Sequence, residues 1–155
     1  MNKLQGNKEV RIIEYEEKYQ QAIIDFLVKI TTEEFNHPER YDYFACKLVE
    51  QYKIGKNGFW IALDSQNRVV GTCGALQQTL NIVKMNCFYI TYEYRGTGLG
   101  ERLYNLFMQF VEKMQYKKIR LCTYKEFDRA IRFYEKRGFK LIEVTEDEYW
   151  YEKEL

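Results

Sequence analysis

The 155-residue sequence has one proline, one histidine and no long apolar run. Without a stretch of about 18 apolar residues no membrane-spanning helix is expected, and no signal-peptide pattern opens the chain. A net charge of +1 provides no field that would attract nucleic acid or a membrane surface. These absences predict a cytoplasmic protein that binds neither nucleic acid nor membranes.

The cysteines are scattered and form no Cys-x-x-Cys pair: Cys46, Cys73, Cys87 and Cys122. Zinc sites need clustered Cys and His ligands, and the sole histidine is His37, so no metal is expected. Reduced, buried thiols are the favoured interpretation. A Cys–His nucleophile pair has no motif to support it.

Aromatic residues are abundant, at 17% of the chain with 14 Tyr and 10 Phe. A tyrosine-rich core with hydrated edges would explain them. The length of 155 residues and the hydrophobic fraction of 46% suit a single domain that spans residues 1–155 and buries a sizeable core.

Apolar periodicity predicts elements in the order β-α-α-β-β-β-α-β-α-β-β. Strands are expected at residues 10–15, 59–63, 69–76, 80–90, 119–123, 139–144 and 148–153. Helices are expected at residues 22–30, 41–52, 99–114 and 127–136. An antiparallel meander followed by a strand–helix–strand crossover predicts an α/β sandwich with a mixed sheet.

A glycine-rich run separates the strand that ends Phe88-Tyr89-Ile90 from the helix that begins near Glu101: Tyr94-Arg95-Gly96-Thr97-Gly98-Leu99-Gly100. Glycines accept positive φ and let backbone N–H groups approach a ligand. A helix N-terminus adds unpaired N–H groups and the positive end of its dipole, and Arg95 can add a cation. We therefore expect a pyrophosphate site here.

The spacing of these glycines fits neither the Rossmann fingerprint nor the Walker A loop. The frame Arg-x-x-Gly-x-Gly does fit, and it resembles the acetyl-CoA signature of the GNAT superfamily of N-acetyltransferases. Further along the chain, the segment Ala130-Ile131-Arg132-Phe133-Tyr134-Glu135-Lys136-Arg137-Gly138-Phe139 is similar to the family's Ala-x-x-Phe-Tyr-Glu-Lys-x-Gly-Phe. The two motifs stand in the family's order, and the resemblance covers about residues 10–145.

The resemblance implies a three-layer α/β sandwich, the GNAT or acyl-CoA N-acyltransferase fold. Its mixed central sheet has about seven strands, with helices on both faces. Acetyl-CoA would be the co-substrate, with its pantetheine arm between the splayed fourth and fifth strands. The residues implied to bind it are Phe88, Tyr89, Ile90, Arg95, Gly96, Thr97, Gly98, Leu99 and Gly100.

Acetyl transfer needs a neutral amine, a donor for the oxyanion of the tetrahedral intermediate and an acid for the departing thiolate. The resemblance makes Tyr134 the acid, and the backbone N–H of Ile90 the oxyanion donor. Spacing alone favours core packing for Tyr134, one of 14 tyrosines. The two motifs together favour the acid role.

The chain departs from the family at two positions. Lys84 stands where many relatives carry an acidic residue on the fourth strand, and Phe127 stands where many carry Asn. The general base is therefore unassigned. Glu33 and Glu34 are candidates, because the segment between the first two helices lines the acceptor side in the family. A solvated loop or helix end is the alternative interpretation of these two residues.

The expected function is transfer of the acetyl group of acetyl-CoA to a primary amine of a small molecule or protein, by direct attack in a ternary complex. One alternative is a regulatory module that binds CoA without catalysis. Another is an acyltransferase that uses a different donor, such as succinyl- or propionyl-CoA. The sequence leaves open the acceptor, the acyl preference and the oligomeric state, a homodimer included.

Overall fold

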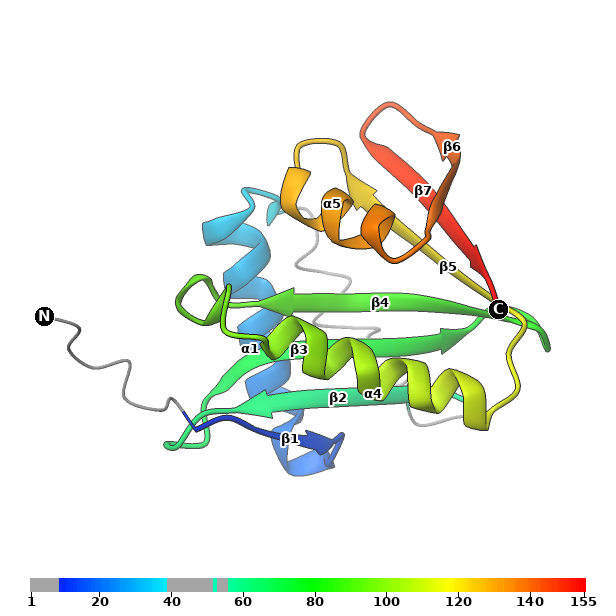
Figure 1. Cartoon of the computed structure of the whole chain (residues 1–155). Helices are drawn as coiled ribbons and strands as arrows, with labels where there is room; N and C mark the ends of the chain where they lie inside the picture. The colour runs from blue at the N-terminus through cyan, green and yellow to red at the C-terminus, as the bar shows by residue number, and fades with distance from the viewer. Residues whose placement is uncertain (1–8, 39–51, 53–55) are drawn as a thin grey trace, which may run out of the picture.

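The computed structural model describes residues 9–38, 52 and 56–155. Within them, seven strands form one mixed sheet in the order β1-β2-β3-β4-β5-β7-β6 (Figure 1). The strands are β1 (Arg11–Glu14), β2 (Gly58–Leu63), β3 (Val69–Gln77), β4 (Ile82–Ile90), β5 (Lys118–Tyr124), β6 (Lys140–Val144) and β7 (Glu148–Glu154). The pairing is antiparallel except between β4 and β5, which are parallel and joined through helix α4 (Leu99–Lys113). This confirms the predicted meander and crossover.

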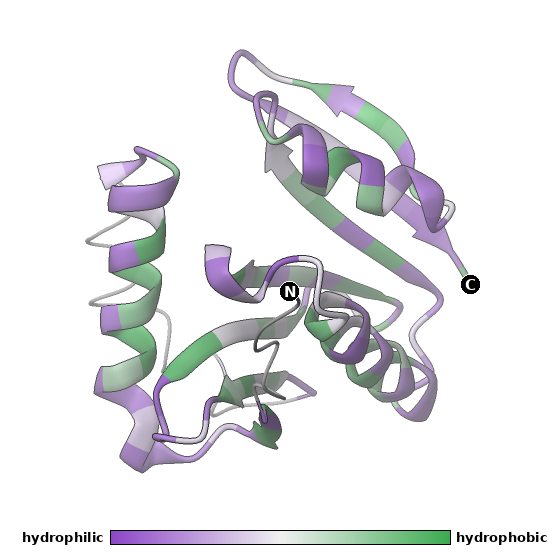
Figure 2. Cartoon of the chain, turned by 60° about the vertical axis from the view of Figure 1, so that its left-hand side comes forward, coloured by the Kyte–Doolittle hydropathy of each residue, from purple (hydrophilic) through white to green (hydrophobic). Residues whose placement is uncertain are grey.

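Helices cover both faces of the sheet. Helix α1 (Gln20–Lys29) lies on one face, and α4 and α5 (Asp128–Lys136) lie on the other (Figure 2). Short turns complete the described helices: η1 (Glu17–Tyr19), the π-helical η2 (Ile30–Glu34) and η4 (Tyr92–Tyr94). None of the helices in these described ranges is long and apolar enough to cross a membrane. The helix predicted at residues 41–52 lies outside the described residues, apart from Tyr52.

Strand alternation produces two apolar layers. On the α4 face, Trp60 and Ala62 of β2 pack in a cluster that includes the fully buried Leu103 and Phe107 of α4. On the α1 face, the alternate β2 residues pack with α1 in a second cluster made of Ile23, Phe26, Leu27, Ile30, Phe59, Ile61, Leu63 and Cys87. The sheet is thus held between two cores, as the predicted three-layer sandwich requires.

Strands β4 and β5 separate along their length. They pair only from Ile82–Lys118 to Lys84–Arg120, so the later residues of β4 have no β5 partner. A β-bulge lies in the part of β4 that does not pair with β5. There, Thr72 of β3 pairs with Tyr89 and Gly74 of β3 pairs with Asn86, and Cys87 has a φ of 51°. A bulge bends the strand that carries it. The bend and the lost pairing open a gap through the sheet.

The turn between β2 and β3 is organised by the carboxylate of Asp64, which is 3% exposed. It accepts hydrogen bonds from the backbone N–H of Gln66 (2.9 Å) and from the N–H and Nε of Arg68 (both 2.8 Å). Burial alone would raise the pKa of Asp64, but the hydrogen bonds and the charge of Arg68 outweigh burial and lower it. Asp64 therefore stabilises the fold above its unfolded pKa of about 3.9, and this contribution is lost as pH falls through the folded pKa.

Replacement of Asp64 by Asn is expected to lower the free energy of unfolding by about 1–3 kcal/mol at pH 7, because it removes a charged acceptor from a buried site. The loss should shrink as the pH falls below about 3.9 toward the lowered pKa of the folded state, where the wild-type carboxylate also becomes protonated. Urea unfolding at several pH values measures this. Asp25→Asn, at an exposed α1 carboxylate that accepts one bond from Gln21, is the control. An Asp64→Asn loss that does not change with pH would show that the charge contributes nothing.

Candidate active site

A cavity of about 650 Å³ lies at the gap between β4 and β5. Its walls come from β4, the glycine-rich loop, β5, α5 and Phe35, which follows η2. Alternation along β4 turns Phe88 toward the α5 side, with its ring centroid 5.5 Å from that of Phe133. Tyr89 turns toward the α1 side, 5.8 Å from Phe35. The cavity therefore reaches both faces of the sheet.

The glycine-rich loop leads directly into α4. Gly96 and Gly98 have φ values of 75° and 87°, and α4 begins at Leu99. A Cβ built on Gly98 would meet no heavy atom within 4 Å, so the loop backbone at this residue faces open space. Leu99 is buried in the core, and the Thr97 hydroxyl donates to the Tyr94 carbonyl at 2.5 Å. The side chains of these two residues therefore support the loop, while Gly96, Gly98 and Gly100 line the cavity.

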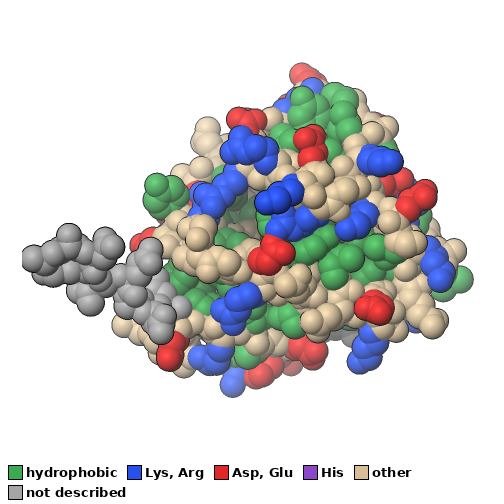
Figure 3. All heavy atoms as spheres, in the orientation of Figure 1, with side chains coloured by type: hydrophobic (Ala, Val, Ile, Leu, Met, Phe, Trp, Pro, Cys, Tyr) green, Lys and Arg blue, Asp and Glu red, His purple; other side chains and the backbone are tan. Residues whose placement is uncertain are grey.

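Two arginines beside the loop were not identified from the sequence. Arg129 and Arg132 of α5 line the cavity, and basic side chains gather over α5 beside a hollow (Figure 3). A Cβ built on Gly96 would lie 3.8 Å from a guanidinium nitrogen of Arg129. Neither arginine forms an ion pair within the described part of the chain. Their spacing of three residues, which puts them on one helical face, was the available signal.

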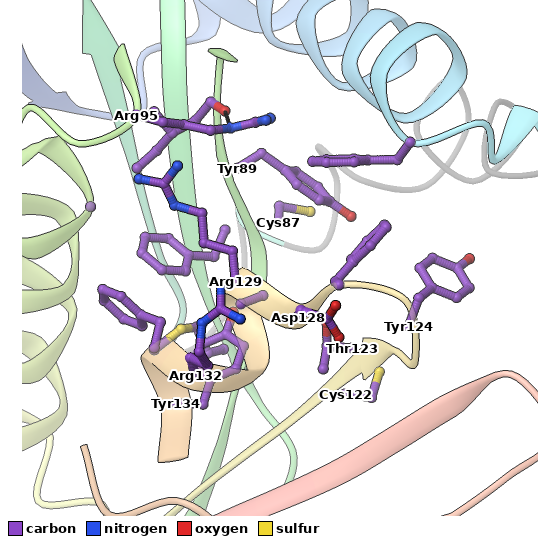
Figure 4. Close-up of a pocket in the computed structure, with 18 of the residues that line it drawn as sticks. Cys87, Tyr89, Arg95, Cys122, Thr123, Tyr124, Asp128, Arg129, Arg132 and Tyr134 are labelled. Carbon is purple, nitrogen blue, oxygen red and sulfur yellow. Dashed lines mark hydrogen bonds between the residues drawn. The ribbon is translucent and has the colours of Figure 1, made fainter. Parts of the chain in front are cut away.

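Arg95 is oriented away from this pair of arginines (Figure 4). Its Nε donates to the Ile90 carbonyl at 3.1 Å, and its terminal nitrogen pairs with the carboxylate of Glu34. The guanidinium also lies 5.4 Å from the ring centroid of Phe35. Arg95 thus joins the glycine-rich loop to the end of η2, and Glu34 balances its charge.

Tyr134 of α5 lines the cavity and is 7% exposed. Its ring packs 5.7 Å from Phe139 and 6.4 Å from Phe88. Burial, followed by the nearby Cys73, Tyr89 and Cys122, raises the pKa of Tyr134 above its usual value. The phenol is therefore protonated at neutral pH and can act as a hydrogen-bond donor in the cavity.

The positions considered for the general base, Glu33, Glu34 and Lys84, lie outside the cavity lining. Glu33 lines a separate depression on the outer side of α1, beside Gln21 and Lys29. Lys84 lies in the paired part of β4, with its Nζ 5.1 Å from the ring centroid of Trp150. Within the described ranges, no cluster of three or more His, Cys, Asp or Glu could hold a metal ion. Neither Glu33 nor Glu34 lines the cavity. Glu33 lies at the separate depression, and the carboxylate of Glu34 is paired with Arg95.

Residues 21–139 match the model of the acetyltransferase (GNAT) family. The chain belongs to this family. It is 33% identical over 87 residues to human N-acetyltransferase 8B, a match that covers 53% of this chain and 38% of that protein. The chain therefore spans less than half the length of this relative.

Solved structures of the family share the fold. A Streptococcus agalactiae acetyltransferase superposes with a TM-score of 0.79 at 28% identity, covering 98% of this chain and 100% of its own. The PaiA N-acetyltransferase of Thermoplasma acidophilum, in complex with coenzyme A, gives 0.78 at 19% identity, covering 95% and 99%. The family and fold expected from the two motifs are confirmed.

Proposed function

We propose that the chain transfers the acetyl group of acetyl-CoA to a primary amine by direct attack in a ternary complex. The observation that carries this proposal is the cavity between β4 and β5, which reaches both faces of the sheet. A donor can enter from the face of α4 and α5, and an acceptor from the face of α1. The two reactants can then meet in the gap.

The face of α4 and α5 suits the donor. The N-terminus of α4 and the glycine-rich loop present backbone N–H groups, and Arg129 and Arg132 add charges, so a pyrophosphate would be held on this side. The unpaired end of β4 offers backbone groups to an extended arm beside Phe88 and Ile90. Membership of the GNAT family and the coenzyme A complex of a structural relative support the same ligand.

The transfer forms a carbon–nitrogen bond as the carbon–sulfur bond breaks. The attacking amine must be neutral, so its ammonium form first loses a proton to water. After attack, the nitrogen loses a second proton to water, the departing sulfur takes one proton from an acid, and that acid regains a proton from water. Tyr134 is the described donor for the sulfur, because its protonated phenol lines the cavity.

Release of free CoA thiol from acetyl-CoA, measured with a panel of primary amines, tests the proposal. Acetyl-CoA consumption that depends on an amine supports it. Tight CoA binding with no turnover for any amine would favour the alternative of a regulatory module. Lys84, in place of the acidic residue expected from the family resemblance, is consistent with that alternative. Faster turnover with propionyl- or succinyl-CoA would reassign the donor.

Acetyl-CoA is expected to raise the melting temperature without added metal. A ligand at about 100 times its Kd stabilises the folded state by about 2.7 kcal/mol, which corresponds to roughly 5–10 °C for a domain of this size. Thermal unfolding with and without EDTA measures the shift. If neither CoA nor acetyl-CoA changes the melting temperature at millimolar concentration, the proposed pyrophosphate site at the glycine-rich loop is wrong.

A further inference from the structure

The α1 side of the cavity is lined by four aromatic rings, and only Tyr89 among them was a site residue expected from the sequence. These rings, which we term the aromatic chamber, are Phe35, Tyr89, Tyr124 and Phe127. Phe127 lies 4.6 Å from Phe35 and 5.3 Å from Tyr124, centroid to centroid. Tyr89 closes the group 5.8 Å from Phe35. Four rings from three segments of the chain thus converge on one side of the cavity: the residue after η2, strand β4 and the β5–α5 connection.

Figure 4 separates this chamber from the phosphate end of the cavity. Tyr124 lies at the opposite end of the view from Arg129 and Arg132, with Tyr134 on the arginine side. Phe127 belongs to the turn before α5. Its ring forms part of the wall of the chamber, in contact with Phe35.

Carboxylates stand at the rim of the aromatic chamber. Glu126 lines the cavity, and its Oε1 lies 2.8 Å from Nε2 of His37, whose ring stacks on Tyr124 at 3.6 Å. A hydrogen bond from its own backbone N–H and one with His37 lower the pKa of Glu126. Glu148, opposite Tyr124 in the β5–β7 register, also lines the cavity. The Arg95 guanidinium is paired with Glu34, and Glu126 is paired with His37.

We infer that the acceptor is a primary amine carried on a flat apolar group, such as an arylalkylamine, whose ring occupies the aromatic chamber. This inference rests on the proposed acetyl transfer. Rings bind a flat apolar body by burial and edge-to-face contact, and their faces also attract cations. The carboxylates at the rim attract the protonated amine as it approaches. A polyhydroxylated amino sugar would instead leave its hydroxyl groups against apolar rings, which is costly.

The first experiment compares kcat/KM for 2-phenylethylamine and ethylamine, which differ by one phenyl ring. Burial of that ring should make 2-phenylethylamine about 10- to 100-fold better. Spermidine and an aminoglycoside serve as the polycationic and polyhydroxylated competitors. A clear preference for either competitor, or equal values for 2-phenylethylamine and ethylamine, would overturn the inference.

The second experiment removes one wall of the chamber. Phe127→Leu should lower kcat/KM for 2-phenylethylamine by about 3- to 10-fold, the value of an aromatic pair, and should lower kcat/KM for ethylamine by less. The matched control is Phe110→Leu. Phe110 belongs to α4, its ring centroid lies 5.4 Å from that of Trp60, and it is outside the cavity lining. An equal loss for both amines in Phe127→Leu would mean that the ring serves only packing.

A binding measurement separates this inference from the transfer itself. Calorimetric titration of the CoA complex with 2-phenylethylamine needs no turnover. One outcome is that acetyl-CoA binds, no amine is acetylated, and 2-phenylethylamine binds to the wild type more tightly than to Phe127→Leu. In that case the proposed transfer is wrong and the chamber assignment stands. No binding of 2-phenylethylamine to the CoA complex would overturn the chamber assignment, whatever the activity.

Discussion

Replacement of Tyr134 by Phe is expected to slow the single-turnover rate of acetyl transfer by about 10²- to 10⁴-fold, the usual contribution of a general acid. The change removes one hydroxyl and keeps the ring, which packs against Phe88 and Phe139. The Kd of acetyl-CoA and the melting temperature should therefore stay close to wild type. Rapid-quench measurement with saturating acceptor gives the rate free of product release.

The raised pKa of Tyr134 adds a test of how the residue acts. Burial keeps the phenol protonated well above neutral pH, so it can donate to sulfur throughout the working range. The wild-type to Tyr134→Phe rate ratio should thus be constant between about pH 6 and pH 9, because the phenol does not titrate there. A ratio that collapses toward pH 9 would show a phenol that ionises, contrary to its burial.

Tyr104→Phe is the matched control. Tyr104 is 6% exposed against 7% for Tyr134, and its ring packs on Phe133, the neighbour of Tyr134. Its hydroxyl has no hydrogen-bond partner in the described part of the chain, and Tyr104 does not line the cavity. Loss of that hydroxyl should leave the rate unchanged. If both variants keep the wild-type rate, Tyr134 is a packing residue and the acid lies elsewhere.

Elements with strong apolar periodicity could be predicted from the sequence. The recurrence of apolar residues in the run that follows Gly98 predicted a helix at residues 99–114, and α4 spans Leu99–Lys113 with Leu103, Phe107 and Val111 buried. Helix α5 was equally readable, because its segment ends at Gly138, which has a φ of 86°. Local pattern suffices where one face of an element is buried.

Features that depend on contacts between distant segments could not be predicted. The bulge at Cys87 reflects the register of β4 against β3, which periodicity in one strand does not contain. Glu33 and Glu34 are adjacent, yet only Glu34 reaches Arg95, because the π-helical turn fixes where each side chain lies. From the sequence, Glu33 and Glu34 were equal candidates for the general base. The sequence assigned Arg95 to a phosphate, which stays a prediction; the structure adds that Arg95 lines the cavity and pairs with Glu34.

The aromatic chamber shows the same limit. Phe127 was recognised as a departure from the family pattern, but its contact with Phe35 joins residues far apart in the chain. A single sequence supplies residue types at each position and not the pairings between them. The proposed acceptor side of the site therefore depended on the structure, whereas the proposed donor side followed from two motifs.

Gly98→Val is expected to weaken CoA binding by about 10- to 1,000-fold, the value of one or two lost hydrogen bonds to a charged group. Gly98 has a φ of 87°, immediately before α4, and open space where a side chain would point. A valine there would occupy the space through which a pyrophosphate approaches the backbone N–H groups. It would also resist the positive φ, at a cost of about 1–2 kcal/mol of stability.

Gly138→Val separates the lost ligand approach from the backbone strain. Gly138 has a φ of 86° and, like Gly98, no heavy atom within 4 Å of a built Cβ. It follows the C-terminus of α5 and is not part of the cavity lining. The two variants should lose similar stability in urea unfolding, while calorimetry with CoA finds weakened binding for Gly98→Val alone. If Gly98→Val keeps the wild-type Kd for CoA, the glycine serves only the turn and the phosphate site must be sought elsewhere.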